Sequence, residues 1–190
     1  ASSIMSKKIA AGANGIVLDV KVGQGAFMET EKEALELAEL MVYIGKDVGR
    51  KVRAVISDMN QPLGLAVGNA LELREAIDTL HGHGPADFRQ HCLTVAGQML
   101  LLAGKAQDET EAKTQLLDLL NSQQAWARFR EWIAAQHGDL RNVDDPDLLP
   151  AARFQRVMTA PRSGYIASVN AREIGLTSML LGGGRAKKGD

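Results

Sequence analysis

The sequence has little cysteine and almost no net charge. A single cysteine, Cys92, among 190 residues excludes an internal disulfide framework. Because Leu93 and Val95 are close neighbours in sequence, we expect a buried and unreactive thiol rather than a catalytic one. The 22 Lys and Arg residues nearly balance the 23 Asp and Glu residues, and the formal net charge of -1 gives no electrostatic reason to expect a nucleic-acid partner.

A long apolar run is also absent. No stretch approaches the roughly 20 apolar residues of a membrane-spanning helix, and the first residues lack the basic and then apolar pattern of a signal peptide. We therefore expect a cytoplasmic protein without a membrane or nucleic-acid partner. The length of 190 residues allows one sizeable core, or one domain and part of another.

Both ends of the chain predict that it is a fragment of a longer polypeptide. It begins inside an expected helix with no initiator Met. It stops within a glycine-rich stretch, residues 182–190, that is typical of the entrance to another element. We interpret residues 182–188 as a basic loop, with a phosphate contact as the alternative.

The first part of the chain predicts a parallel strand, helix and strand unit. Helical spacing covers residues 2–12, and apolar strand-like runs follow at residues 16–18 and 52–56. Between these runs, Thr30 and Glu33 have the spacing of a capping box at the start of a helix. This order of elements favours parallel strands with a right-handed crossover. The expected fold class is therefore α/β, with a central, mixed or mostly parallel sheet and flanking helices.

The second part predicts a helical layer and then a change of composition. Asn69 is expected to cap a helix, further helices follow, and the pattern after residue 150 is β-like. We therefore assign residues 1–150 to a central α/β domain and residues 151–190 to the start of an incomplete C-terminal α+β module. The expected helices cover residues 71–80, 88–103, 109–120 and 125–136, and the β-like runs cover residues 154–158 and 164–169.

Candidate ligand-binding residues lie near the start of the chain. On a helix, Ser3 and Lys7 project from one face and can meet one ligand together. The common alternatives are a helix cap for the serine and a solvated charge for the lysine. Phe27 follows the first strand, where open α/β sheets bind ligands, although an aromatic there is commonly part of the core. The turn between Gly23 and Gly25 lacks the later glycines of a dinucleotide-binding loop, so we expect loop flexibility there.

A second candidate site follows the second strand. The carbonyls of Leu63 and Ala66 with the carboxylate of Glu72 would form an oxygen-only cage for a hard cation. Alone, Glu72 is equally an ordinary surface carboxylate, and the sequence leaves both alternatives open. Three histidines without ligand-like spacing are interpreted as helix-end or surface residues, and two tryptophans as packing residues: His81, His83, His91, Trp126 and Trp132.

Short motifs occur in order along the chain, at residues 3–8, 17–23, 25–28, 58–64, 67–72, 163–166 and 182–185. Their content and order resemble those of the pyrimidine-nucleoside phosphorylases, the thymidine phosphorylase family. The resemblance runs through almost the whole chain, although residues 105–150 carry little of the family signature.

The resemblance implies an enzyme, a pentosyltransferase of pyrimidine metabolism and nucleoside salvage. Such an enzyme cleaves a thymidine- or uridine-type nucleoside with inorganic phosphate as co-substrate. The products are the free base and (deoxy)ribose 1-phosphate. The family also implies a large α/β domain, a smaller helical domain, a C-terminal module and a homodimer of the full-length chain.

The resemblance also implies roles for the candidate residues. Ser3 and Lys7 would hydrogen-bond the pyrimidine edge, and Phe27 would pack beside the ring. Lys7 would act catalytically, by stabilising the charge that the leaving base gains. A structural cation, monovalent or calcium, would be held by three ligands: Leu63, Ala66 and Glu72.

The family pattern places other groups upstream of Ala1. These are most of the helical domain, the glycine-rich phosphate loop and the arginine that contacts the base. We therefore expect no phosphate-binding residues in this chain and no phosphorolysis by residues 1–190 alone. Alternatives of the same fold are an AMP phosphorylase and an anthranilate-type phosphoribosyltransferase, and the Ser3 and Lys7 pair favours a pyrimidine over anthranilate. A non-catalytic scaffold assembled through helices at residues 87–137 is a further alternative.

Overall fold

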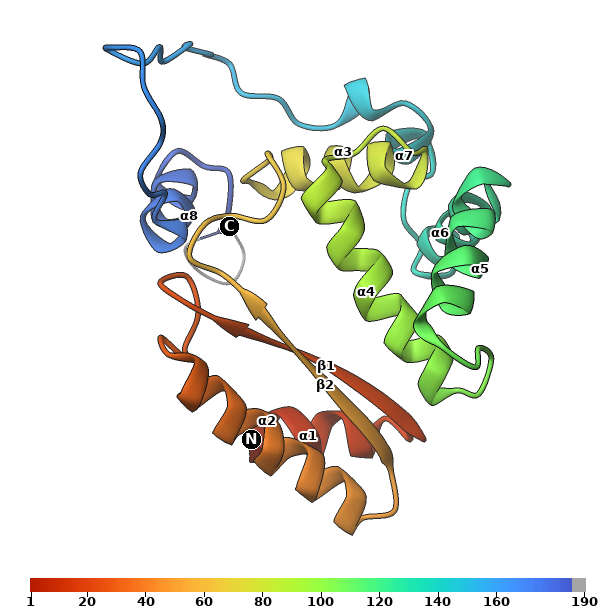
Figure 1. Cartoon of the computed structure of the whole chain (residues 1–190). Helices are drawn as coiled ribbons and strands as arrows, with labels where there is room; N and C mark the ends of the chain where they lie inside the picture. Colours follow the sequence, from red (N-terminus) through yellow and green to blue (C-terminus); the bar gives the residue numbers. More distant parts are fainter. Residues whose placement is uncertain (186–190) are drawn as a thin grey trace.

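A parallel pair of strands lies between helices on both of its faces, and a helical layer follows it in sequence (Figure 1). The structure, a computed structural model, describes residues 1–185. This arrangement confirms the α/β class. In chain order the elements are α1 (Ser2–Ala10), β1 (Gly15–Val22), α2 (Glu31–Asp47), β2 (Lys51–Asp58), α3 (Asn69–Leu80), α4 (Ala86–Leu102), α5 (Glu109–Asn121), α6 (Gln124–Ala135), α7 (Arg141–Asp144), a 3₁₀ turn (Pro146–Leu148) and α8 (Ala171–Leu180).

In the described part of the chain the sheet consists of β1 and β2, which run parallel as predicted. Gly15 pairs with Lys51 at one end of the ladder, and Val22 pairs with Asp58 at the other. Helices α1 and α2 lie on one side of the sheet and α4 lies on the other (Figure 1). The carboxyl ends of both strands therefore meet at one edge, which is where ligands bind in open α/β sheets.

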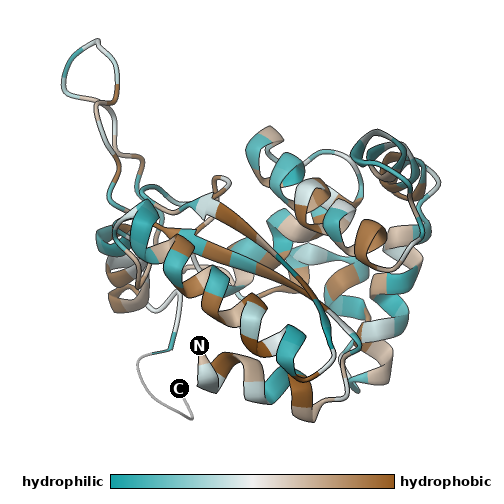
Figure 2. Cartoon of the chain, turned by 60° about the horizontal axis from the view of Figure 1, so that its bottom comes forward, coloured by the Kyte–Doolittle hydropathy of each residue, from teal (hydrophilic) through white to brown (hydrophobic). Residues whose placement is uncertain are grey.

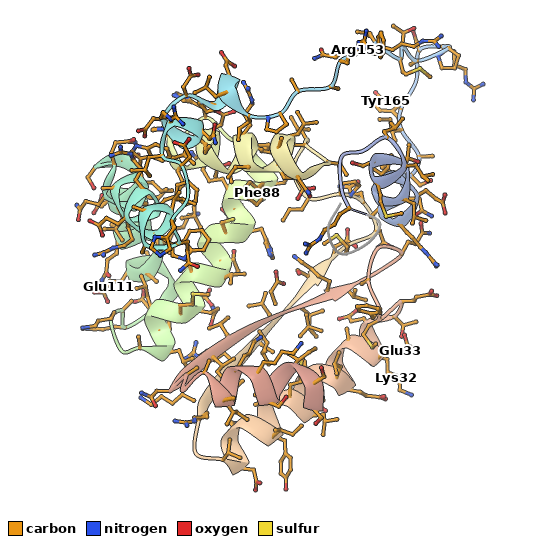
Figure 3. The ribbon with its side chains drawn as sticks, turned by 180° about the vertical axis from the view of Figure 1, so that it is seen from behind. Lys32, Glu33, Phe88, Glu111, Arg153 and Tyr165 are labelled. Carbon is orange, nitrogen blue, oxygen red and sulfur yellow. The ribbon has the colours of Figure 1, made fainter. Side chains whose placement is uncertain are left out.

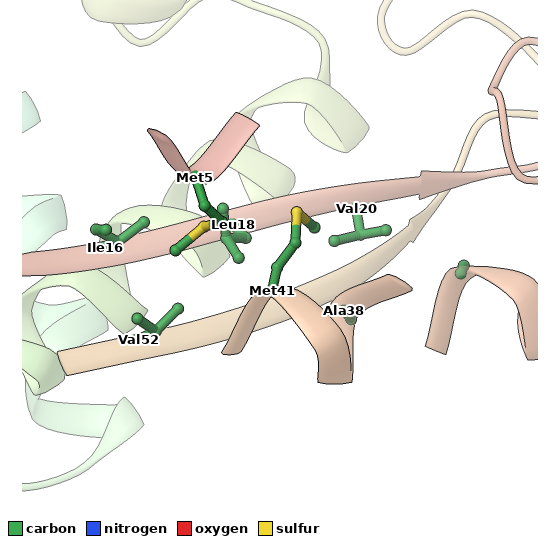
Figure 4. Close-up of a cluster of buried hydrophobic side chains, with 8 residues drawn as sticks. Met5, Ile16, Leu18, Val20, Ala38, Met41 and Val52 are labelled. Carbon is green, nitrogen blue, oxygen red and sulfur yellow. The ribbon is translucent and has the colours of Figure 1, made fainter. Parts of the chain in front are cut away.

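A cluster of buried apolar side chains joins α1, α2 and the sheet. Along β1, Ile16, Leu18 and Val20 are buried and alternate with more exposed residues, because successive strand side chains point to opposite faces. Met5 of α1 and Met41 of α2 pack against this face, and Met5 is 0% exposed (Figure 4). Since burial of one large apolar side chain contributes about 1.5–3 kcal/mol, this cluster holds α1 and α2 on the sheet.

Two predictions concern the residues that cap the starts of α2 and α3. The capping box of α2 is confirmed, because Thr30 Oγ1 accepts a hydrogen bond from the Glu33 N–H at 3.3 Å and the Glu33 carboxylate accepts one from the Thr30 N–H at 3.1 Å. Figure 3 shows Glu33 at this end of α2. The prediction of Asn69 as a cap is wrong, since Gly68 is the N-cap of α3 and has a φ of 131° that glycine readily adopts.

The helical layer confirms the expected helices and the two packing tryptophans. At the end of α3, the ring of His81 lies 4.4 Å from that of Trp126 on α6, measured between centroids. Trp126 also contacts Phe129, with ring centroids 5.8 Å apart. Trp126 is therefore a packing residue. Trp132 packs against Phe129 as well, with ring centroids 6.0 Å apart, although it is 58% exposed.

The β-like runs after residue 150 form no strand within residues 1–185, so that prediction is wrong there. Residues 149–170 instead form an extended connection to α8 (Figure 1), and Arg153 and Tyr165 on this connection lie far from the sheet (Figure 3). The physical reason is that a strand is stable beside a partner strand, and none pairs with this connection in the described residues. The domain boundary near residue 150 stays a prediction.

Cys92 is exposed on α4, so the prediction of a buried thiol is wrong. Successive residues of an α-helix differ by about 100° in direction, and on α4 it is the next residue, Leu93, that is buried. Partial burial still raises the pKa of the Cys92 thiol above its ordinary value. The nucleophilic thiolate is therefore scarce at neutral pH.

The apolar residues follow the layers of the fold. In Figure 2 brown, hydrophobic segments make up much of the two strands, and hydrophobic and hydrophilic segments alternate along the helices around them. None of the helices described within residues 1–185 combines the length and the apolar character needed to cross a membrane.

Candidate functional site

Ser3 and Lys7 lie on the exposed face of α1. Met5 stands between them in sequence but is buried in the core, so the packing of α1 directs the other two side chains outward. The N-cap of α1 is Ala1, without a side-chain capping bond, so Ser3 is not a helix cap. Within residues 1–185 the Ser3 hydroxyl has no hydrogen-bond partner and the Lys7 ammonium has no ion-pair partner. Both groups are therefore free to meet a ligand.

Phe27 lies on the turn that follows β1, and its side chain is 100% exposed. Backbone bonds hold this turn: the Gly23 N–H donates to the Met28 carbonyl at 2.9 Å, and the Gly25 N–H donates to the Met59 carbonyl at 2.9 Å. Because its side chain is fully exposed, Phe27 does not belong to the core. The turn is a separate element from α1, and no hydrogen bond joins the two in the described part of the chain.

Carboxylates from two helices hold the loop that follows β2. Glu75 of α3 accepts hydrogen bonds from the N–H groups of Leu65 and Ala66, each at 2.9 Å. Asp87 at the start of α4 accepts one from the Gly64 N–H at 3.0 Å. A cavity of about 480 Å³ opens beside this loop, and its lining includes Leu65, Ala66 and Glu75.

Glu72, the expected cation ligand, contacts the end of the same loop. Its carboxylate accepts a hydrogen bond from the N–H of Gly68, the N-cap of its own helix, at 2.9 Å. The carbonyls of Leu63 and Ala66 accept no hydrogen bond among the described residues, so both are available as ligands. Carbonyl and carboxylate oxygens suit a hard cation. Glu75, which sequence reasoning missed, also contacts the loop, at Leu65 and Ala66.

A polar cluster lies between the sheet and α4. His91 Nε2 lies 2.6 Å from Asp19 Oδ2, and Lys21 Nζ lies 2.8 Å from the same oxygen. Ser57 Oγ donates to Asp19 Oδ1 at 2.5 Å. Burial raises the pKa of Asp19, but the hydrogen bonds from these three partners, with Lys21 first, outweigh it and hold the pKa below its ordinary value. The cluster therefore attaches α4 to β1 through an ionised carboxylate.

The His91 side chain is only 18% exposed, so its interpretation as a surface residue is wrong. The alternation along β1 could have indicated a polar partner on this side. Asp19 and Lys21 alternate with the buried Leu18 and Val20, which places them on the opposite face of the strand.

The family of the chain follows from its sequence. Residues 2–126 match the profile described as "Glycosyl transferase family, a/b domain". The chain belongs to this glycosyl transferase family. The matched range contains α1, the Phe27 turn, the loop after β2 and the polar cluster under α4.

Two curated relatives are similar to this chain over its whole length. A pyrimidine-nucleoside phosphorylase of Bacillus subtilis (strain 168) is 54% identical over 190 residues, and one of Staphylococcus aureus (strain USA300) is 53% identical over 190 residues. Each comparison covers 100% of this chain and 44% of the relative, so the chain spans less than half the length of these relatives. The resemblance found from the motifs is confirmed.

The glycosyl transferase domain offers no side-chain cluster for a transition metal among residues 1–185. No group of three or more His, Cys, Asp or Glu residues there could hold a metal ion. A cation bound mainly by backbone carbonyls would not need such a cluster of side chains.

Proposed function

We propose that this chain forms the base-binding part of a pyrimidine-nucleoside phosphorylase. The observation that carries the proposal is the 54% identity over 190 residues to a relative of that name. Ser3 and Lys7, which lack partners within residues 1–185, agree with such a role. The proposal includes inorganic phosphate as co-substrate, a homodimer of the complete enzyme and a place in the cytoplasm.

The proposed reaction needs a group that stabilises the departing base. The bond between the sugar C1′ and the base nitrogen breaks, and a phosphate oxygen bonds to C1′. The electron pair of the broken bond goes to the base, which gains negative charge. An ammonium at the base edge stabilises this charge more in the transition state than in the ground state, and Lys7 would supply it. The Ser3 hydroxyl would orient the base edge, and Phe27 would pack against the ring.

A hybrid enzyme tests the proposed activity. In this hybrid, residues 1–190 replace the matched segment of the B. subtilis relative. We expect it to release thymine or uracil from the nucleoside only when inorganic phosphate is present, and we expect residues 1–190 alone to release none. Base release is followed by ultraviolet absorbance, with the unmodified relative as positive control. A folded hybrid without phosphate-dependent release would overturn the activity, and turnover by residues 1–190 alone would overturn the assignment of the phosphate site to other residues.

We propose further that the loop after β2 holds a structural cation, monovalent or calcium. The carbonyls of Leu63 and Ala66 would supply two ligands, and a carboxylate would supply the third. Glu72 Oε1 accepts one hydrogen bond, from the Gly68 N–H, whereas Glu75 Oε1 accepts two, from the N–H groups of Leu65 and Ala66. Glu72 is the less occupied carboxylate and is therefore kept as the proposed third ligand, with Glu75 as the alternative.

Paired amide variants test the cation site. We expect potassium or calcium chloride to raise the unfolding temperature of the hybrid above its value in tetramethylammonium chloride of the same ionic strength, because a ligand of the folded state stabilises it. Glu72→Gln should lose this increase, since the carboxylate charge disappears while the amide oxygen still accepts the hydrogen bond from the Gly68 N–H. Glu75→Gln should keep it. Loss in Glu75→Gln alone would make Glu75 the ligand, and an increase retained by both variants would overturn the site.

A further inference from the structure

We propose that Asn60 is a positioning residue that fixes the Phe27 turn at the edge of the base site. The inference rests on the proposed function, because Asn60 would act through Phe27 and not on the substrate. Phe27 is 100% exposed, so packing of its own side chain does not determine where it lies. Its position depends on the backbone of the turn at residues 23–28.

Asn60 supplies a side-chain anchor for this turn. Its Oδ1 accepts a hydrogen bond from the Gln24 N–H at 3.2 Å. The other bonds that hold the turn in the described chain join backbone groups, such as the Gly25 N–H and the Met59 carbonyl. A substitution at position 60 can therefore alter the turn while the sequence of the turn stays unchanged.

Asn60 is itself held from two sides. Its backbone N–H and its Nδ2 both donate to Asp58 Oδ1, at 3.0 and 2.6 Å, so the last residue of β2 orients the side-chain amide. Its carbonyl accepts a hydrogen bond from the N–H of Ala171, the first residue of α8, at 3.0 Å. Asn60 thus joins the end of β2, the Phe27 turn and the start of α8.

Close packing at this junction leaves little room for adjustment. A Cβ added at Gly23, where φ is +123°, would lie 2.7 Å from Asn60 Oδ1. A Cβ added at Gly25 would lie 2.6 Å from the Cβ of Ala171. Because such short separations are not tolerated, the turn can approach Asn60 and α8 only with glycines at these positions. A change in the Asn60 side chain should therefore be transmitted to Phe27.

The asparagine amide suits both of its neighbours. It accepts a hydrogen bond at Oδ1 and donates one at Nδ2. An aspartate at position 60 would lose the donor and bring a second carboxylate to Asp58. An alanine would leave the Gln24 N–H without this acceptor.

The test compares Asn60→Ala and Asn60→Asp with the control Asn14→Ala in the hybrid enzyme. Asn14 accepts a hydrogen bond from Arg50 at 2.9 Å and directly precedes β1. It therefore lies at the amino-terminal end of the strands, opposite to the end that carries the Phe27 turn. For both Asn60 variants we expect the KM for the nucleoside to rise about threefold to tenfold, the effect of losing one hydrogen bond, with kcat changed less than about twofold. An unchanged KM in these variants, or an equal rise in the control, would overturn the proposal.

A double variant separates positioning from a general loss of stability. If Asn60 acts through Phe27, the KM of Asn60→Ala with Phe27→Ala should equal that of Phe27→Ala alone. Additive effects would overturn the proposal. Hydrogen exchange gives a second readout, because the Gln24 amide should exchange faster in Asn60→Ala, and unchanged exchange would also overturn it. An unchanged KM in Phe27→Ala itself would instead contradict the proposed role of Phe27, so the two failures are distinguishable.

Discussion

Lys7→Met is expected to lower the kcat of the hybrid enzyme about 100-fold to 1000-fold, the effect of removing one group that stabilises transition-state charge. Methionine retains an unbranched apolar stem, so the variant loses the charge with little loss of packing. The charge on the base develops only as the glycosidic bond breaks. For this reason kcat and kcat/KM should fall together, as measured by steady-state kinetics with thymidine and uridine.

The matched control for this prediction is Lys8→Met. Lys8 is the next residue of α1 and half-buried, and its direction on the helix differs from that of Lys7 by about 100°. We expect its kcat to stay within about twofold of that of the unsubstituted hybrid, as for a surface residue away from the reacting atoms. Nucleosides with an electron-withdrawing group at the 5-position of the base give a second check. Their bases leave more readily as anions, so the defect of Lys7→Met should shrink, and a constant defect would contradict the role.

Features set by neighbouring residues could be predicted from the sequence. The capping box of α2 needs only Thr30, Glu33 and the backbone between them, and it formed as expected. The parallel pairing of β1 and β2 likewise follows from a short strand, helix and strand order. The capping groups are three residues apart, and β1 and β2 are consecutive strands joined by one helix.

Features that depend on distant residues could not be predicted in the same way. Asp19 and His91 are 72 positions apart, and only the packing of α4 on the sheet shows that they meet. The choice between Glu72 and Glu75 depends on the path of the loop after β2, because residues three apart share a helix face. The β-like pattern at residues 154–158 indicated strand propensity, but a strand also needs a partner.

The orientation of the base-binding groups combines both kinds of information. The motifs indicated Ser3 and Lys7 through their resemblance to a family, whereas their direction depends on Met5. Met5 is buried against β1 and α2, and this packing turns the opposite face of α1 to solvent. The core packing of Met5 therefore orients the proposed base-binding residues as well as stabilising the fold.

Met5→Ala is expected to lower the free energy of unfolding of the chain by about 2–5 kcal/mol, as for other large-to-small changes in a core. The Met5 side chain is 0% exposed and lies among Leu18 and Met41 (Figure 4). Gly45 of α2 has no side chain to fill the space left behind, and a Cβ there would lie 3.0 Å from Met5 Cε. The full cavity cost should therefore remain. Urea unfolding followed by circular dichroism measures it.

Met99→Ala is the matched control, because Met99 on α4 is 51% exposed and should lose no more than about 0.5 kcal/mol. Equal losses in the two variants would contradict the place of Met5 in the core. In the hybrid enzyme, Met5→Ala should also raise the KM for the nucleoside at a temperature where the protein stays folded, since a loosened α1 no longer directs Ser3 and Lys7. Met99→Ala should leave KM unchanged. A destabilised Met5→Ala hybrid with normal KM would show that the core does not orient the base-binding face.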